Sequence, residues 1–445
     1  MNLEQLDNIV KRVARRTGLD DYELFLTFGT SLNCRIENWE ITVQLKKDIF
    51  SGSLRVIKNR RMGFVPFTEP SPGVLELGIK IALNMAPAAP FDSFAVIPDR
   101  LKTPPAFDPE IVRLLDNPSR IKTLAQELIK RAFDTGKITT LEGMIQVNRE
   151  IKLISTFNSP VPAIAERTAF SAFAEVNTQD FDFVAGRKLP DLEKVAALGA
   201  SVARELPGTE TTPEAEGIKG KIVPVVLHPS FTEEMIRQLV AEHLYASTVQ
   251  DGMSQYHLNE LVMSPLITAG DDATIPFGES TFPVDDEGTP ARKNLVVENG
   301  VLKMFLYDRT TASRENVQST GNGRRRPVLI EEEHEAPVRC TINDIFIIPG
   351  TTPLTEIIKK IDYGVLIKVL LGFHTANRTT GDFANTLYFG RIIRNGELAE
   401  LPQAGRWAIK GNALNALRNV KTISRETLST GSAILPWLQT ELTVA

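Results

Sequence analysis

The segment Leu295-Val296-Val297-Glu298-Asn299-Gly300-Val301-Leu302-Lys303 predicts a β-hairpin in the second half of the chain. Asn and Gly both tolerate the positive φ angles that a two-residue hairpin turn requires, and apolar residues stand on both sides of the pair. The same signal returns at Asn395-Gly396, between Ile392-Ile393 and Leu398. The two hairpins are too short to indicate a repeat, but they predict that the second half is mostly β-sheet.

A stretch rich in turn formers separates this half from the first. Residues 207–217, with the sequence PGTETTPEAEG, lack apolar periodicity, which is typical of a domain boundary. A chain of 445 residues also exceeds the size of most single domains. We therefore predict an α+β protein with two domains. The N-terminal domain, of mixed helices and strands, covers residues 1–215, and a larger, β-dominated C-terminal domain covers residues 216–445.

Helix and strand signals alternate along both domains. Helices are expected to begin at Ser71-Pro72 and Asn117-Pro118, because a proline at the first helical position loses no hydrogen bond. Periodicity predicts further elements: a helix ending at Gly18, a hairpin turn over residues 58–61, strands over 143–176, a helix over 190–206, a strand over 222–227 and one helix over about 232–247.

Composition narrows the classes of function. Hydrophobic residues make up 42% and charged residues 24% of the chain, the balance of a globular protein. The net charge of -5 argues against direct binding of nucleic acid, and the basic cluster Arg324-Arg325-Arg326 is followed by the acidic run Glu331-Glu332-Glu333, which favours a solvated loop.

The chain shows no signal for a membrane or for an oxidising compartment. No apolar run approaches about 18 residues, and the N-terminus is amphipathic and charged, so we expect neither a membrane span nor a signal peptide. Cys34 and Cys340 form no CxxC spacing, so both are expected to be buried, reduced thiols. These features predict a cytoplasmic protein.

No metal site or nucleophile of the chain's own is predicted. No two of the five histidines lie one helical turn apart, as a zinc protease requires. His334-Glu335 precedes Ala336-Pro337, and that proline would break the helix needed for a second histidine. His243 is expected on a partly exposed helix face. Phosphate-binding glycine motifs and a serine nucleophile elbow are absent, and Thr430-Gly431-Ser432 has no recognisable base nearby.

Two kinds of loop could bind a ligand. Asp271-Asp272 and Asp285-Asp286-Glu287 could hold a cation, but acidic turns are common on an acidic surface, which we favour. Ser319-Thr320-Gly321-Asn322-Gly323-Arg324 suits a loop whose backbone closely approaches a ligand, a peptide or another backbone. The alternative for this glycine loop is an ordinary surface turn.

Several segments, in order and over most of the chain, resemble the TldD/PmbA family, also labelled modulators of DNA gyrase. They are Asp285–Pro290, Val297–Lys303, Ser319–Arg325, Pro349-Gly350, Thr380–Phe383, Ile393–Leu398 and Ile409–Asn412, with looser matches at Leu54–Val56, Arg61–Phe64 and Asn158-Ser159. The resemblance implies an intracellular protease of two related subunits. The TldD type carries His-Glu-x-x-x-His on a helix and a cysteine ligand near its C-terminus, whereas the TldE or PmbA type lacks them. The complex degrades or trims peptides and unfolded segments.

The position of that motif distinguishes the two types. Aligning the family's strand with Val225-Val226-Leu227 places Arg237 at the first histidine, Gln238 at the general base and Glu242 at the second histidine. A guanidinium stays protonated and cannot bind zinc, and Gln cannot accept a proton from water. No cysteine follows Cys340.

The resemblance therefore implies a TldE/PmbA-type subunit with no catalytic residues, no metal and no cofactor of its own, while the zinc belongs to a TldD-like partner. Thr320, Gly321, Asn322, Gly323 and Arg324 are its candidates for contact with a peptide substrate. Two other functions remain open. One is a free-standing homodimeric protein that binds peptides or regulates. The other is a metal-independent hydrolase that uses Cys34 or a serine.

Overall fold

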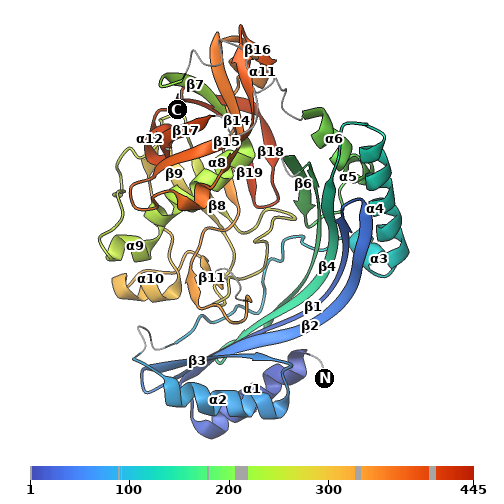
Figure 1. Cartoon of the computed structure of the whole chain (residues 1–445). Coiled ribbons are helices and arrows are strands. Elements are labelled where there is room, and N and C mark those ends of the chain that lie inside the picture. The colour runs from blue at the N-terminus through green and yellow to red at the C-terminus, as the bar shows by residue number, and fades with distance from the viewer. Residues whose placement is uncertain are drawn as a thin grey trace.

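A computed structural model describes residues 3–88, 91, 93–177, 180–205, 219–325, 332–399 and 407–445. The expected domain boundary at residues 207–217 lies outside these residues. The described part contains one six-stranded sheet formed by the first half and one eleven-stranded sheet formed by the second half (Figure 1). The predicted α+β class, with a larger β-rich second half, is confirmed.

The sheet of the first half is antiparallel and has the order β3-β2-β1-β4-β5-β6. Its strands are β1 Asp21–Glu37, β2 Glu40–Lys58, β3 Arg61–Thr68, β4 Leu141–Thr156, β5 Ala163–Val176 and β6 Asp180–Gly186. Positive φ angles at Asn59 and Arg60 form the predicted turn between β2 and β3. Several of these strands far exceed the usual length of 5–6 residues, and they curve around the second half (Figure 1).

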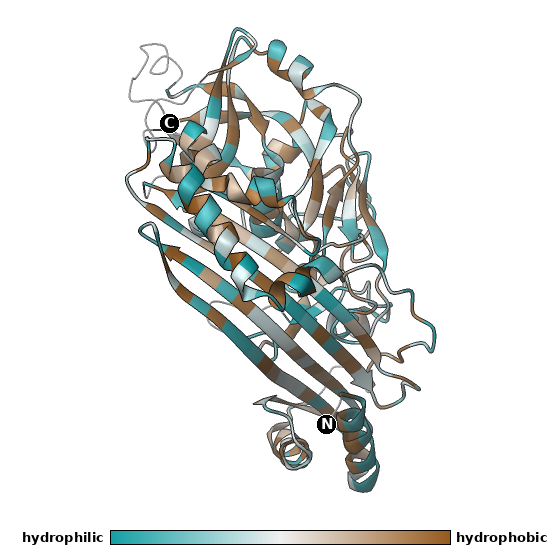
Figure 2. Cartoon of the chain, turned by 90° about the vertical axis from the view of Figure 1, so that its right-hand side faces the viewer, coloured by the Kyte–Doolittle hydropathy of each residue, from teal (hydrophilic) through white to brown (hydrophobic). Residues whose placement is uncertain are grey.

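Alternation along the strands gives the sheet two different faces. On β1, Leu24, Leu26 and Leu32 are buried with the helices, whereas Phe25 points the other way and packs with Phe282 of the second half. Figure 2 shows the resulting bands of apolar and polar residues along the strands. The helices that pack on this sheet are α1 Leu3–Thr17, α2 Pro72–Met85, α3 Pro109–Leu115, α4 Pro118–Phe133, α5 Leu192–Ala196 and α6 Leu198–Glu205.

The larger sheet closes on itself in its middle. β7 pairs with both β14 and β19, so the path β19-β17-β15-β14-β7 forms a ring. The strands are β7 Ile222–Leu227, β8 Ala269–Asp272, β9 Lys293–Glu298, β10 Val301–Leu302, β13 Ile345–Ile347, β14 Tyr363–Leu371, β15 Asp382–Arg394, β16 Glu397–Ala399, β17 Ala408–Asn412, β18 Thr422–Ser429 and β19 Ala433–Val444. A separate pair, β11 Gly323–Arg325 and β12 Val338–Cys340, lies at the junction with the first half.

Short helices complete the second half. They are α8 Pro229–Met235, η1 Ile236–Val240, η2 Ala241–Leu244, α9 Ala246–Gln250, α10 Arg309–Glu315, α11 Leu354–Lys359, η3 Phe373–Thr375 and α12 Ala413–Arg418. Among the helices of the described residues, none has the length and apolar character needed to cross a membrane.

The local predictions with a strong turn or cap signal are confirmed. Both Asn-Gly pairs form hairpin turns, with φ of 48° and 79° at Asn299 and Gly300 and 48° and 77° at Asn395 and Gly396. Ser71 caps α2 as expected, by accepting a hydrogen bond from the amide of Val74.

Two predicted single helices are wrong. The helix over about 232–247 is divided into α8, a π-helical turn (η1), a 3₁₀ turn (η2) and α9, and the helix over 190–206 is divided into α5 and α6. The apolar periodicity alone does not distinguish a continuous helix from consecutive short ones.

Candidate functional site

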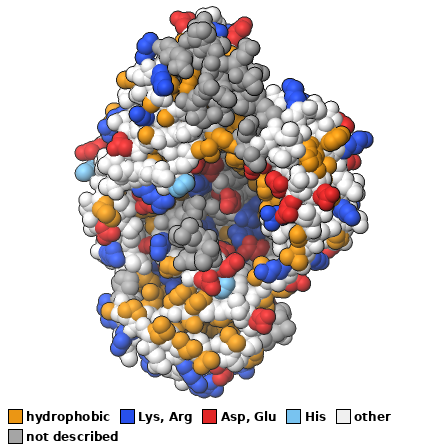
Figure 3. All heavy atoms as spheres, viewed as in Figure 1, with side chains coloured by type: hydrophobic (Ala, Val, Ile, Leu, Met, Phe, Trp, Pro, Cys, Tyr) orange, Lys and Arg blue, Asp and Glu red, His pale blue; other side chains and the backbone are white. Residues whose placement is uncertain are grey.

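A cavity of about 450 Å³ lies between the two halves of the molecule. Figure 3 shows a hollow at the middle of the molecule in which basic and acidic side chains gather. The cavity lining is dominated by charged and polar side chains: Lys152, Arg167, Arg187, Glu233, Arg237, Glu279, Ser280, Asp286, Arg324, Arg325, Glu333, Thr341, Ile342 and Ser432. The sheet of the first half supplies Lys152 and Arg167, and α8, η1 and β11 supply residues from the second half.

The helical segment that borders this cavity contains the distorted turn. His228 caps α8 by accepting a hydrogen bond from the amide of Ser230 at 3.2 Å. The amide of Ala241 then donates to the carbonyl of Ile236, five residues earlier, which is the pattern of a π-helix. In an α-helix, residues five apart point in different directions because each residue turns the chain by about 100°. A π turn contains more residues per turn, so two residues five apart point in more similar directions. Arg237 and Glu242 are five residues apart, and the π turn lies between them.

Of the three residues that the sequence resemblance assigns to the motif positions, Arg237 lines the cavity, and Gln238 and Glu242 do not. Its Nε donates to Glu233 Oε1 at 2.8 Å, and its Nη2 donates to the carbonyls of Asn343 at 2.9 Å and Ser432 at 2.7 Å. Gln238 Nε2 lies 3.5 Å from Glu234 Oε1, and Glu242 is half-buried on η2. The Arg237 side chain therefore links the π turn to two other segments of the second half.

Glu233 connects Arg237 to the C-terminal part of the chain, at Thr430 and Ser432. Its carboxylate accepts hydrogen bonds from the hydroxyls of Thr430 and Ser432. No base for Thr430-Gly431-Ser432 was recognisable in the sequence, because the carboxylate that meets these hydroxyls belongs to Glu233, which precedes Ser432 by 199 residues. Since Glu233 is also ion-paired with Arg237, its negative charge is already balanced, which makes it a poor general base for Ser432.

The glycine loop is buried, so the alternative of an ordinary surface turn is wrong. Asn322 is fully buried, and its Nδ2 donates to Asp271 Oδ2 at 2.9 Å and to the carbonyl of Thr341 at 3.0 Å. Thr320 Oγ1 donates to Asn322 Oδ1 at 2.7 Å. A Cβ on Gly323 would lie only 2.3 Å from Glu287 Oε2. The backbone of the glycine loop therefore closely approaches another part of the protein, at Glu287.

Of the five candidates for peptide contact, Arg324 is the one that lines the cavity; Thr320, Gly321, Asn322 and Gly323 lie behind it. Arg324 is fixed there by a hydrogen bond from its Nε to Asn343 Oδ1 at 2.8 Å.

Asp271 organises the buried side of this loop. It accepts hydrogen bonds from the side-chain amides of Asn294, Asn322 and Asn343 at 3.1, 2.9 and 3.1 Å. Burial raises the pKa of Asp271, although these amides oppose the shift. The expectation of an exposed acidic turn at Asp271-Asp272 is wrong, because both residues are buried. Within the described residues, no group of three His, Cys, Asp or Glu side chains is arranged to hold a metal ion.

The second acidic run is also buried and joins the two halves. Asp286 Oδ1 lies 3.2 Å from Lys152 Nζ, and Glu287 Oε1 lies 3.1 Å from Arg55 Nη1. Burial raises the pKa of Glu287 to about 7. Burial also acts to raise the pKa of Asp286, but the charge of Lys152 and those of the neighbouring arginines outweigh it and hold that pKa below its ordinary value.

The expected solvated loop at Arg324-Arg325-Arg326 is wrong for its described residues. Arg325 is 3% exposed, pairs with Glu23 and donates from Nε to Ser53 Oγ at 3.1 Å. Glu333 pairs with Lys152. Arg326 and Glu331 lie outside the described residues. Arg325 is therefore buried against a charge of the first half, whereas Glu333 is half-buried and Glu332 is exposed.

The remaining sequence candidates lie away from the cavity lining. His243 is 1% exposed, so the predicted partly exposed helix face is wrong; its Nδ1 accepts a hydrogen bond from the amide of Gln255 at 3.2 Å. Cys34 and Cys340 are free and buried, as predicted, and burial raises the pKa of both thiols. A raised thiol pKa disfavours the thiolate that a nucleophile requires.

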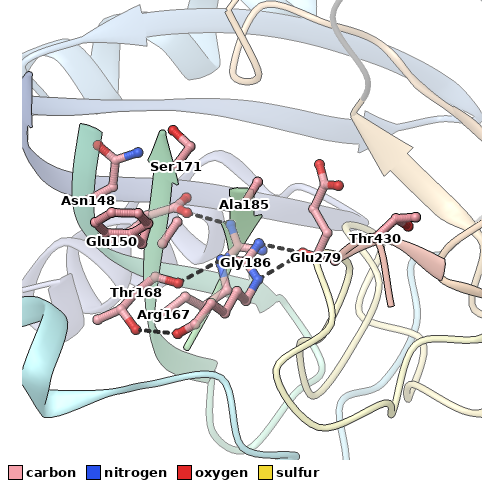
Figure 4. A pocket seen from close by; sticks show the side chains of 13 residues that line it. Asn148, Glu150, Arg167, Thr168, Ser171, Ala185, Gly186, Glu279 and Thr430 are labelled. Carbon is pink, nitrogen blue, oxygen red and sulfur yellow. Dashed lines mark hydrogen bonds and ion pairs between the residues drawn. The ribbon is translucent and has the colours of Figure 1, made fainter. Parts of the chain in front are cut away.

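A second cavity of about 330 Å³ adjoins the first and shares Arg167, Arg187 and Glu279 with it. Figure 4 shows Asn148, Glu150, Arg167 and Ser171 around this space, with Glu150 and Arg167 on neighbouring strands. Sequence patterns gave no signal for the smaller cavity, because its lining comes from segments far apart in the chain.

Comparisons with known proteins agree with this architecture. A family model described as the PmbA/TldA metallopeptidase C-terminal domain matches residues 219–445, about half of the chain. The chain is 30% identical over 177 residues to a protein named metalloprotease TldD homolog from Buchnera aphidicola subsp. Acyrthosiphon pisum. That match covers 39% of this chain and only 35% of the length of that relative.

Two solved structures are similar to the whole chain. TldE from Thermococcus kodakarensis superimposes with a TM-score of 0.84 at 22% identity and covers 99% of both chains. A putative modulator of a DNA gyrase from Thermotoga maritima has a TM-score of 0.83 at 21% identity and covers 100% of both chains. At these identities the likeness establishes the shared fold.

Proposed function

This chain belongs to the PmbA/TldD family of metallopeptidases, and from that premise we propose that it is a non-catalytic, TldE/PmbA-like subunit. Its partner is a TldD-like zinc metalloprotease, and together they degrade or trim peptides and unfolded segments. The observation that carries the proposal is Arg237. It stands at the position of the first zinc-binding histidine and directs its guanidinium to Glu233 and to backbone carbonyls.

The residues at the motif positions do not fit a zinc ion. A guanidinium has donors only and keeps its proton, so Arg237 offers no lone pair to a metal. Gln238 cannot act as the general base that activates a metal-bound water. Of the two positions that bind zinc in the motif, only the one held by Glu242 retains a negatively charged ligand atom. The zinc and the chemistry of peptide cleavage therefore belong to the partner subunit.

The charged cavity supports a role in holding the peptide. It lies between the two halves, beside the helix that corresponds to the motif, and is lined by residues of both. A subunit can position a peptide for cleavage without binding a metal ion itself. We also place the complex in the cytoplasm, because Cys34 and Cys340 are both free thiols.

Reconstitution with a TldD-like subunit tests this proposal. The two purified chains are mixed, separated by size-exclusion chromatography and assayed for cleavage of an unfolded protein. We expect co-elution, and cleavage that needs both chains and disappears when the partner's motif glutamate is replaced by glutamine. Failure to co-elute and to cleave would overturn the proposal. A stable dimer of this chain alone that still binds peptides would instead favour the free-standing homodimeric protein.

A further inference from the structure

Arg167 is a buried cation with unused hydrogen-bond donors. It lies on β5, is 7% exposed, and faces both cavities. Its Nη2 donates to Glu150 Oε2 on β4 at 2.5 Å, whereas its Nε has no hydrogen-bond partner among the described residues. A guanidinium carries five N–H donors, so a single carboxylate contact leaves most of them unused. Leaving a buried donor unpaired is unfavourable, and an arriving acceptor would remove this cost.

Arg187 places a second positive charge next to the first. It follows β6 and donates hydrogen bonds to the carbonyls of Gly278 at 2.9 Å and Thr168 at 3.4 Å, and also to the carbonyl of Glu279. Within the described residues no ion pair with a carboxylate neutralises it. Burial lowers the pKa of Arg187 to about 10, and the charge of Arg167 adds to this shift. Carbonyl dipoles hold this cation in place without balancing its charge.

The charges around the larger cavity favour an anion. Six of its lining side chains are cationic and four are anionic, although the chain as a whole has a net charge of -5. The smaller cavity adds one further carboxylate, Glu150, which is paired with Arg167, so the cations of the two cavities outnumber the anions by one. A cavity with an excess of one charge concentrates ligands of the opposite charge.

We propose that the two adjoining cavities bind a carboxylate of a peptide, which the Arg167 guanidinium receives beside Arg187. Planar guanidinium and carboxylate groups match each other through paired hydrogen bonds. The carboxylate belongs either to the C-terminus of the peptide or to an acidic side chain, since both offer the same chemistry. The neighbouring Asn148 and Ser171 supply polar groups for the adjacent peptide backbone. The inference rests on the proposed function for the identity of the ligand as a peptide.

Direct binding to the purified full chain tests the inference. Three hexapeptides of glycine and alanine carry an uncharged boron-dipyrromethene fluorophore at the N-terminus. The first has a free C-terminal carboxylate, the second a C-terminal amide, and the third a C-terminal amide with one internal glutamate. Fluorescence anisotropy gives Kd for each. We expect at least one carboxylate peptide to bind about 10-fold more tightly than the neutral amide.

Arg167→Gln is expected to remove this preference, so that all three peptides bind equally. Arg149→Gln is the matched control, because Arg149 and Glu166 form an ion pair between the same two strands, where the Arg149 side chain is 43% exposed. The control should keep the preference. Circular dichroism verifies that both variants are folded, and the peptide comparison on the unmodified chain does not depend on any variant.

The three peptides also identify the source of the carboxylate. Tight binding of the first peptide alone indicates a C-terminal carboxylate, and tight binding of the third indicates an acidic side chain. Equal affinity for all three, or no binding of any, overturns the inference. Either of these results with successful reconstitution leaves the subunit proposal intact. Failed reconstitution with a carboxylate preference overturns the subunit proposal alone.

Discussion

Replacement of Arg237 by alanine tests whether this residue is a structural cross-link at the motif position. The substitution removes the ion pair with Glu233 at 2.8 Å and the hydrogen bonds to the carbonyls of Asn343 and Ser432. Removing one partner of a buried pair costs about 3–5 kcal/mol. The two side chains are 15% and 11% exposed. We therefore expect the free energy of unfolding to fall by the lower end of this range, about 3 kcal/mol.

Urea denaturation followed by tryptophan fluorescence measures this loss. A Trp39→Phe background restricts the signal to Trp407 and Trp437, which both lie in the second half with Arg237. Arg113→Ala is the control, because its side chain is 67% exposed and its pair with Glu110 spans one helical turn; we expect a loss below about 0.5 kcal/mol. A loss for Arg237→Ala within about 0.5 kcal/mol of the control would refute the cross-link.

The same variant separates structure from chemistry. In the reconstituted complex, at a temperature where Arg237→Ala is folded, kcat for peptide cleavage should equal that of the unmodified complex. A fall of about 100-fold or more in kcat with an unchanged fraction of folded complex would show that Arg237 contributes to the reaction.

Three further predictions concern the buried network between the halves. Gly323→Ala should lower the free energy of unfolding by about 1–3 kcal/mol, because the new Cβ would meet Glu287 Oε2 at 2.3 Å. The control Gly73→Ala lies in α2 with no atom within 4 Å, so it should leave the melting temperature unchanged or raise it slightly. Burial raises the pKa of Glu287 to about 7 from 4.5. The stability that this shift contributes is therefore present below pH 4.5 and is lost as the pH rises to about 7. Glu287→Gln should remove about 3 kcal/mol of that pH dependence in urea titrations, and an unchanged dependence of the free energy of unfolding on pH would contradict the shift. Lys152→Met breaks a buried ion pair and should lower the free energy of unfolding by about 3–5 kcal/mol in the same titrations. The control Lys303→Met breaks a pair in which the lysine side chain is 41% exposed, and it should lower this free energy by less than about 1 kcal/mol. Equal losses for the two variants would contradict the buried network.

The elements with local causes could be predicted from the sequence. Asn299-Gly300 and Asn395-Gly396 form hairpins because the two residues of the turn accept positive φ whatever surrounds them. Ser71 and the proline after it begin α2 for an equally local reason. The class of the fold followed from such signals added together.

The partners of the buried charges could not be predicted in this way. Asp286, Glu287 and Arg325 have the composition of a surface loop, and their burial depends on Glu23, Arg55 and Lys152, which lie more than one hundred residues away. A polar sequence shows which charges need partners but not where those partners lie. The one usable signal was that three acidic residues at 285–287 and three basic residues at 324–326 both require partners if they are buried.

The candidate site was predicted in part. Arg237 lines the cavity, whereas the glycine loop supplies Arg324 and the rest of the loop packs inside. The π turn could not be predicted, because its wider backbone turn depends on tertiary contacts and not on residue type. Arg167 was missed because an arginine on an alternating strand is ordinarily assigned to the solvent side, and no sequence pattern distinguished Arg187, which follows β6.

The zinc content of the purified chain tests the central claim most directly. The chain and a TldD-like subunit are produced in parallel in zinc-supplemented medium, dialysed against metal-free buffer and measured by plasma mass spectrometry. A non-catalytic subunit with Arg237 at the first motif position is expected to retain less than about 0.1 zinc per chain, while the TldD-like subunit retains about one. About one zinc per chain in this protein, lost on reaction with a chelator, would contradict the account.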